Sequence, residues 1–312
     1  MSCTLNSKLM FLLFASLAGV GCGQTPSPFA LQFAAALNGT AATCDQELTG
    51  LGPTKQHAVG VNDLRFYVSN LQFKNSAGEP VALTLDSNEF QLNLDSGSVA
   101  LIDLMGNSSG SCAPTAVAAA EGTARTNSVV SGTTLVDEVA AISFDVGVPQ
   151  AVMKSVIGVN TPEGAPSPMS EMYWSWASGY RHFVFNFAVR DAMNSTGDGY
   201  LHIGSRNCGP PAGRALSDRA ACEFLNTPQF SAPQFNLKTN KVSVDIGALL
   251  AGLDFVAPIY DPKTQMVIGQ GVGVQCHSSP SQPDCPAVFS GLGVDPGTGV
   301  AQAAGNRVFV VR

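Results

Sequence analysis

The stretch Arg181-His182-Phe183-Val184-Phe185-Asn186-Phe187 decides the fold class, because a large apolar residue recurs in it at every second position. Successive side chains of a β-strand point to opposite faces, so the three phenylalanines share one face. His182, Val184 and Asn186 then occupy the other face. This alternation is typical of a strand that has one face packed against a hydrophobic core.

The same period of two recurs along the chain, between turn signals rich in Gly, Asn, Asp and Pro. It predicts further strands at 64–69, 81–85, 89–94, 98–104, 127–131, 142–146, 199–203, 233–237, 241–246 and 307–311. Helical patterns are few, at 246–253 and 286–292. Many short strands favour an all-β fold, an antiparallel β-sandwich with long loops, a few short helices and disulfides. The chain shows no internal repeat or linker, so 33–312 is expected to form a single domain.

The N-terminus has the pattern of an export signal. Lys8 precedes an apolar run at 9–18, and small residues then lead to Cys22, so 1–22 is expected to be a signal peptide. The run is shorter than the roughly 20 apolar residues that a bilayer span needs. Gly19-Val20-Gly21-Cys22 is similar to a bacterial lipobox, although Gly19 stands where the lipobox usually has Leu. We therefore expect lipidation at Cys22, a tether at 23–32 and a lipid-anchored protein of the cell envelope, in the periplasm or at the outer membrane. Plain cleavage and secretion is the alternative.

Cysteine usage supports an oxidising compartment. Cys3 and Cys22 belong to the export segment, and an even number remain in the mature chain: Cys44, Cys112, Cys208, Cys222, Cys276 and Cys285. Connectivity cannot be chosen from the sequence alone. Short loops favour local bridges between Cys208 and Cys222 and between Cys276 and Cys285, which leaves Cys44 with Cys112 as the longer-range pair.

Charge and motifs exclude several classes of function. A net charge of -7 argues against nucleic-acid binding, which needs a basic surface. The chain has no Cys-x-x-Cys, so thioredoxin-like chemistry is not indicated. Paired carboxylates of a glycosidase need no local motif and stay open as an alternative. We expect a protein that is not an enzyme.

Histidines are the candidate metal ligands, since neutral imidazole commonly binds copper and zinc. His182 and His202 lie on predicted strands one hairpin-like loop apart and could face each other across paired strands. From these residues alone, two ordinary strand histidines without a metal are the stronger interpretation. His277, beside Cys276 in a bridged loop, is expected to be a surface residue.

Two further groups of residues suit a site. Trp174 and Trp176, the only tryptophans, share one face of a strand, as core residues or as an oxidisable site beside the histidines. An oxygen-rich loop containing Asp191, Asn194 and Asp198 could hold calcium. That loop lacks EF-hand spacing, so a plain turn is the stronger interpretation.

Several stretches, in order from about residue 33 to 312, together resemble the MbnP-like family, the four-Cys partner of a "metallo-mystery pair". Its most specific piece is Met172-Tyr173-Trp174-Ser175-Trp176-Ala177-Ser178-Gly179-Tyr180. The others are Asp63-Leu64-Arg65-Phe66-Tyr67-Val68-Ser69, Ala100-Leu101-Ile102-Asp103-Leu104, Gly147-Val148-Pro149, Ala165-Pro166-Ser167-Pro168, His202-Ile203-Gly204-Ser205 with Cys208, and Cys285-Pro286-Ala287-Val288-Phe289 with Leu292-Gly293.

The resemblance implies an exported copper-binding β-sandwich, serving copper acquisition or handling. It also implies that Trp176 or Trp174 is oxidised to kynurenine by a partner di-haem peroxidase of the MauG/MbnH type. His202 would be the best-supported metal ligand. The family often has an Asn-His pair after Gly-Val-Pro, whereas 156–161 contain no histidine, so His182 is the expected substitute. The alternative is a structural or adhesive envelope lipoprotein without metal.

Overall fold

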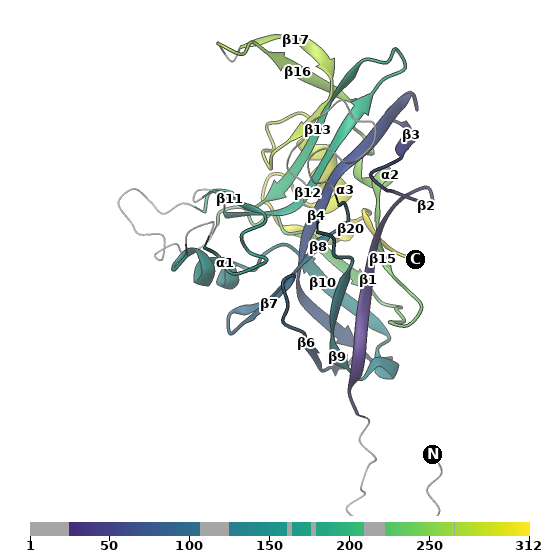
Figure 1. Cartoon of the computed structure of the whole chain (residues 1–312), viewed down its shortest axis with the longest axis vertical. Helices are drawn as coiled ribbons and strands as arrows, with labels where there is room; N and C mark the ends of the chain where they lie inside the picture. The colour runs from purple at the N-terminus through teal and green to yellow at the C-terminus, as the bar shows by residue number, and fades with distance from the viewer. Residues whose placement is uncertain (1–24, 107–124, 161–163, 176–178, 209–221, 265) are drawn as a thin grey trace, which may run out of the picture.

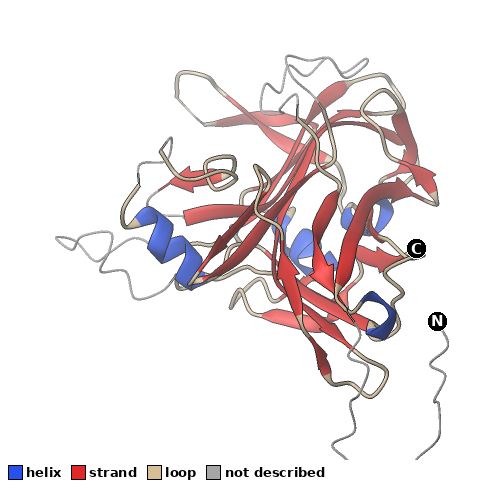
Figure 2. Cartoon of the chain, turned by 60° about the horizontal axis from the view of Figure 1, so that its bottom comes forward, coloured by secondary structure: helices blue, strands red, loops and turns tan. Residues whose placement is uncertain are grey.

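The computed structural model describes residues 25–106, 125–160, 164–175, 179–208, 222–264 and 266–312. Two β-sheets pack face to face and enclose the core, as the all-β prediction required (Figures 1 and 2). The smaller sheet has the order β21-β15-β1-β9-β6, with β2 beside β1. Its strands are β1 (Ser27–Leu37), β2 (Thr40–Ala41), β6 (Leu83–Leu85), β9 (Val129–Thr134), β15 (Val242–Asp245) and β21 (Phe309–Val311).

The larger sheet has the order β14-β10-β4-β12-β13-β18 and carries five further short strands. Its main strands are β14 (Gln229–Ala232), β10 (Ala141–Val146), β4 (His57–Lys74), β12 (Gly179–Arg190), β13 (Thr196–Gly204) and β18 (Val274–Cys276). The added strands are β3 (Glu47–Leu51), β5 (Pro80–Val81), β7 (Gln91–Leu94), β8 (Gly97–Asp103) and β11 (Tyr173–Ser175). Two hairpins form separate two-stranded sheets: β16 (Val256–Tyr260) with β17 (Val267–Val272), and β19 (Leu292–Val294) with β20 (Ala301–Asn306).

The long strand β4 organises the larger sheet. Along one edge it pairs first with β12, through 58–66, and then with β10, through 68–74. Along its other edge it pairs with β3, β8 and β5. The strands β12 and β10 therefore meet end to end beside the middle of β4.

The core between the sheets is rich in phenylalanine. All three phenylalanines of the 181–187 stretch are fully buried, as the alternation predicted. Phe66 of β4 stacks on Phe183 and meets Phe309 of the opposite sheet edge-on, with ring centroids 6.0 and 5.2 Å apart. Burying a phenylalanine stabilises the fold by about 1.5–3 kcal/mol, so this cluster joins the two sheets.

The outer face of the larger sheet is also partly covered. Helix α1 (Gln150–Ile157) and β11 lie there and enclose a second apolar cluster that includes Tyr67, Met153 and Tyr180 (Figure 1). The short helices η1 (Val136–Glu138), α2 (Ile246–Leu249) and α3 (Cys285–Gly291) complete the fold. No helix in the described ranges is long and apolar enough to cross a membrane.

Two expectations need correction, and one element was missed. The expected tether at 23–32 is wrong from Ser27 onward, because β1 begins there and pairs with Thr134 of β9. No strand forms at 233–237, where Phe235 and Leu237 are buried within turns instead. Helix α1 was not predicted. Residues 1–24, with the signal peptide and Cys22, lie outside the described residues.

Two disulfides match the expected local pairs, Cys208–Cys222 and Cys276–Cys285. Cys44 is also disulfide-bonded. Its expected partner, Cys112, lies outside the described residues. Each bridge restricts the unfolded chain and so stabilises the folded state, typically by about 2–4 kcal/mol.

Candidate metal site

Two imidazoles meet on the outer face of the larger sheet. The Nδ1 atoms of His202 and His277 are 3.1 Å apart, and the ring centroids are 4.8 Å apart. Two nitrogen ligands that bind one tetrahedral ion at about 2.0 Å lie roughly 3.3 Å from each other. The spacing of this pair therefore suits a shared metal ion with little movement.

The strands that bring the pair together come from distant parts of the sequence. The strand β13 pairs in parallel with β18, and Leu201 lies opposite Cys276. Both of these residues are fully buried in the core between the sheets. Side chains alternate along a strand, so the next residues, His202 and His277, both turn to the outer face.

The segment that carries His277 is held against β13 by specific bonds. The hydroxyl of Ser278 accepts from the backbone N–H of Gly204 at 2.7 Å and donates to the carbonyl of His202 at 2.8 Å. The side chain of Gln282 accepts from the N–H of His277 at 2.6 Å. The bridge between Cys276 and Cys285 closes the same loop. These contacts fix the register of one imidazole against the other.

A chain of buried polar groups lies behind His202. Its Nε2 is 2.8 Å from Oδ1 of Asn186, and Nδ2 of Asn186 donates to Oδ2 of Asp63 at 3.4 Å. Asp63 in turn accepts two bonds from Arg65, at 2.8 and 2.6 Å. Asn186, Asp63 and Arg65 are 0%, 1% and 4% exposed. Buried polar groups that are bonded in this way hold their neighbours in one arrangement.

Two aromatic rings flank the imidazole pair. The indole of Trp174, on β11, is perpendicular to the ring of His202, with centroids 6.5 Å apart. Tyr200 lies 6.0 Å from His202 and 6.3 Å from His277 between ring centroids. Trp174 and His277 are both half-buried. Trp176 lies outside the described residues.

Electrostatics keep His202 neutral. Burial lowers its pKa to about 3, and the positive charges of Arg181, His277 and Arg65 add to the shift. Desolvation disfavours the charged imidazolium. Around neutral pH His202 therefore presents a lone pair, which is the form of imidazole that binds a metal.

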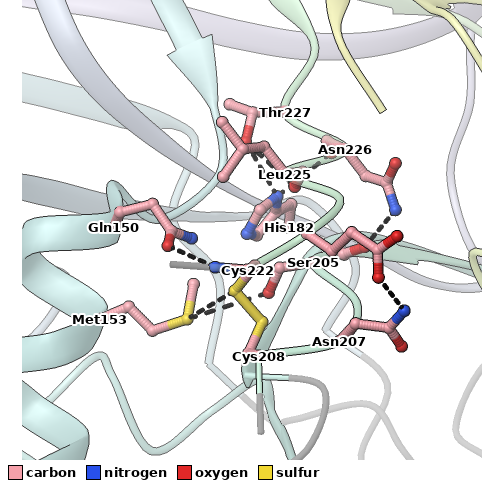
Figure 3. The surroundings of a disulfide bond; sticks show 12 residues. Gln150, Met153, His182, Ser205, Asn207, Cys208, Cys222, Leu225, Asn226 and Thr227 are labelled. Atoms are coloured by element: carbon pink, nitrogen blue, oxygen red, sulfur yellow. Dashed lines mark hydrogen bonds between the residues drawn. A yellow bond between two sulfur atoms is a disulfide. The ribbon is translucent and has the colours of Figure 1, made fainter. Parts of the chain in front are cut away.

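The structure places His182 in a different setting. Val184, and not His182, lies opposite His202, so the expected facing pair is wrong in register. His182 is at the irregular start of β12, near the point where β12 meets β10, and packs against Gly147. Its Nδ1 is 3.2 Å from the carbonyl oxygen of Asn226 and 3.4 Å from the hydroxyl of Thr227 (Figure 3).

His182 is buried as well, and this lowers its pKa. It is 1% exposed, and burial lowers its pKa to about 4. Its Nε2 is buried and has no hydrogen-bond partner. Figure 3 shows it in the neighbourhood of Met153 and the Cys208–Cys222 bridge. We interpret His182 as a structural residue that fills the junction between two strands.

The oxygen-rich loop is a turn. Oδ1 of Asp191 accepts from the backbone N–H groups of Met193 and Ser195 at 2.9 and 2.7 Å. Asp198 accepts from the hydroxyl of Tyr200 at 3.1 Å, and Asn194 accepts from Arg190. Among the described residues no group of three or more His, Cys, Asp or Glu side chains could hold a metal ion. The calcium expectation gains no support from this geometry.

His277 is the residue that sequence reasoning missed. It was expected on the surface, yet it is half-buried against His202. A signal was present: the residues preceding His277 read as a short strand, and Cys276 next to it needed a fixed partner. The parallel pairing of β18 with β13 could not be read from local patterns.

Comparisons with known proteins agree with this fold. The family model MbnP matches residues 26–267. The solved structure of MbnP from Methylosinus trichosporium is similar to this chain with a TM-score of 0.67 and 24% sequence identity, over 92% of this chain and 99% of that chain. No curated protein matches in sequence.

Proposed function

Because the chain belongs to the MbnP family, we propose that it is an exported copper-binding protein whose site is built on His202 and His277. The family is linked to copper handling in general. One observation carries the proposal: the Nδ1 atoms of the two imidazoles lie 3.1 Å apart, and the indole ring of Trp174 lies beside His202, with ring centroids 6.5 Å apart. Imidazole is a ligand that suits copper.

A copper ion held by two nitrogens can take a further ligand, and the ring of Trp174 lies beside His202. An indole has no lone pair to offer a metal. Its oxidation product kynurenine has a carbonyl and an aniline nitrogen, so oxidation would add a ligand where none existed. We assign the oxidation to Trp174, since its ring lies against His202.

The oxidation needs a partner. Two equivalents of hydrogen peroxide can place two oxygen atoms on the indole and leave as two waters, and hydrolysis then releases the formyl carbon as formate. A di-haem peroxidase of the MauG/MbnH type supplies this chemistry. The half-buried position of Trp174 leaves part of its ring accessible to such a partner.

Cellular location follows from the N-terminal pattern. Lys8, the apolar run at 9–18 and Cys22 support export with lipid anchoring at the cell envelope. The even number of cysteines in the mature chain and the two described disulfides fit an oxidising compartment. The protein would bind copper there for acquisition or handling, and would not act as an enzyme.

The test combines mass and metal content. The protein is produced with and without a di-haem peroxidase of this class, digested and mapped by mass spectrometry, and its copper is measured after dialysis. We expect the peptide that contains Trp174 to gain one oxygen and lose one carbon, and copper to be retained only then. Unmodified tryptophans and no retained copper would reject the proposal and favour a structural or adhesive sandwich without metal.

A further inference from the structure

The amide of Asn186 has one possible orientation in its surroundings. The carboxylate of Asp63 only accepts hydrogen bonds, and it lies 3.4 Å from Nδ2 of Asn186. Oδ1 of Asn186 is therefore turned toward Nε2 of His202, at 2.8 Å. An amide oxygen can only accept, so Nε2 of His202 carries the proton.

This proton determines the second hydrogen bond of the site. A neutral imidazole has one N–H, so a His202 that is protonated on Nε2 has a bare Nδ1. That Nδ1 is 3.1 Å from Nδ1 of His277. The proton between the two rings must then belong to His277.

We infer that Asn186, oriented by Asp63, is a positioning residue that fixes His202 in the Nε2–H form and aims its Nδ1 lone pair at the metal position. The inference rests on the proposed copper site and extends it. It also makes the two imidazoles unequal: His202 is ready to bind a metal, whereas His277 must first release the proton on Nδ1. That proton leaves Nδ1 as Nε2 gains one, so His277 changes tautomer while His202 keeps its own.

The neighbours of Asp63 support this role. Two bonds from Arg65 hold the carboxylate, which is 1% exposed, so it is charged and fixed where it meets the amide. Partners that orient a metal-binding histidine typically change metal affinity about 10–100-fold when removed. Asn186→Leu keeps similar volume and removes both amide contacts.

The experiment reads the tautomers directly. Protein labelled with ¹⁵N in histidine, whose tryptophan has first been oxidised by the di-haem peroxidase, is studied by long-range ¹H–¹⁵N NMR without metal and with one equivalent of Cu(I). Resonances are assigned with the variants His202→Gln and His277→Gln. We expect His202 protonated on Nε2 in both states and His277 changing from the Nδ1–H to the Nε2–H form.

Copper affinity gives the second readout. Cu(I) is titrated against a competing chelator into the oxidised wild type, Asn186→Leu and the control Asn127→Leu. The side-chain amide of Asn127 bonds backbone groups of Leu101 and Val129. We expect roughly a 10–100-fold loss for Asn186→Leu and less than about threefold for the control. A wild-type His202 protonated on Nδ1, or unchanged affinity in Asn186→Leu, overturns the inference. If Asn186→Leu does not fold, the wild-type spectra decide. A wild type that binds no Cu(I) rejects the proposed function, while the metal-free spectrum still decides the tautomer.

Discussion

His182 and His202 lie on neighbouring strands of one sheet, are both almost fully buried, and both have lowered pKa values. Only one of them has the surroundings of a metal ligand. His182 donates toward a backbone carbonyl, and its other nitrogen has no hydrogen-bond partner. His202 has one nitrogen held by an amide and the other facing a second imidazole.

The difference shows that burial and neutrality do not by themselves make a ligand. Both properties follow from desolvation, which acts on any enclosed imidazole. A ligand also needs a lone pair aimed at a second donor, and this depends on the register of the strands. The register of β12 against β13 places Val184 opposite His202, and His182 lies at the β-bulge between Arg181 and Phe183.

The largest expected effect is on copper binding, which should distinguish His202 from His182. His202→Ala and His277→Ala should each weaken copper affinity at least about 100-fold, roughly 2.7 kcal/mol of binding free energy, because one of two nitrogen donors is lost. His182→Ala should stay within about threefold of the wild type. Competition titration of the oxidised protein measures all three. Equal losses of copper affinity in His182→Ala and His202→Ala would contradict the assignment of His202 as a ligand and His182 as a structural residue.

Acid stability tests the structural role of His182. Its folded-state pKa of about 4 lies below the usual value of 6.5, so the unfolded chain takes up a proton first as the pH falls. The stabilisation is therefore present above pH 6.5 and lost as the pH falls toward 4. At about 1.36 kcal/mol per unit, His182 accounts for about 3 kcal/mol of this loss.

Urea unfolding of the wild type and His182→Gln at pH 7 and pH 4.5 checks this expectation. Glutamine can still donate to the carbonyl of Asn226 but does not titrate in this range. The difference between the two pH values should be smaller in the variant. The same pH dependence in both proteins would contradict the account.

Gly147→Ala should destabilise the fold through His182 and leave copper binding unchanged. Gly147 has a φ of +147°, and an added Cβ would lie 2.7 Å from the ring of His182. Strained backbone and a crowded core each cost about 1–3 kcal/mol. Gly78→Ala is the control, because its φ is +83° with open space around an added Cβ. In thermal unfolding, Gly147→Ala should have a lower midpoint temperature than the control. A loss of copper affinity in Gly147→Ala would show that the surroundings of His182 and the copper site are not independent.

Ser278→Ala is expected to weaken the copper site less than the loss of either imidazole does. It leaves the N–H of Gly204 and the carbonyl of His202 without their bonds to the hydroxyl, which costs about 1–3 kcal/mol of stability. The segment that carries His277 would then be held less firmly against β13, which should weaken copper binding by less than about tenfold. Ser243→Ala is the matched control, since Ser243 is 0% exposed and its hydroxyl has no hydrogen-bond partner. Equal affinity in both variants would show that Ser278 does not set the register.

Much of the fold could be predicted from the sequence because one face of most strands packs on the core. The alternation at 181–187 and 142–146 gave strands at the observed places. Composition was misleading at the N-terminus, where Pro26 and Pro28 suggested a tether. Phe29, Leu31 and Phe33 alternate there and are buried, so the period-two pattern was the better guide.

The site was less predictable because its parts meet through non-local pairing. The closeness of Trp174 and His202 was expected, and the structure confirms it. The second imidazole was assigned to His182 instead of His277, since a parallel contact between β13 and β18 leaves no mark in either local sequence. Asn186 and Asp63 were not considered as parts of a site, although both lie in stretches that the sequence singled out.

Anomalous diffraction at the copper absorption edge tests the central claim most directly. A crystal of the oxidised, copper-loaded protein should give one strong peak within bonding distance of Nδ1 of both His202 and His277. A peak at His182, or a copper ion bound away from this imidazole pair, would contradict the account.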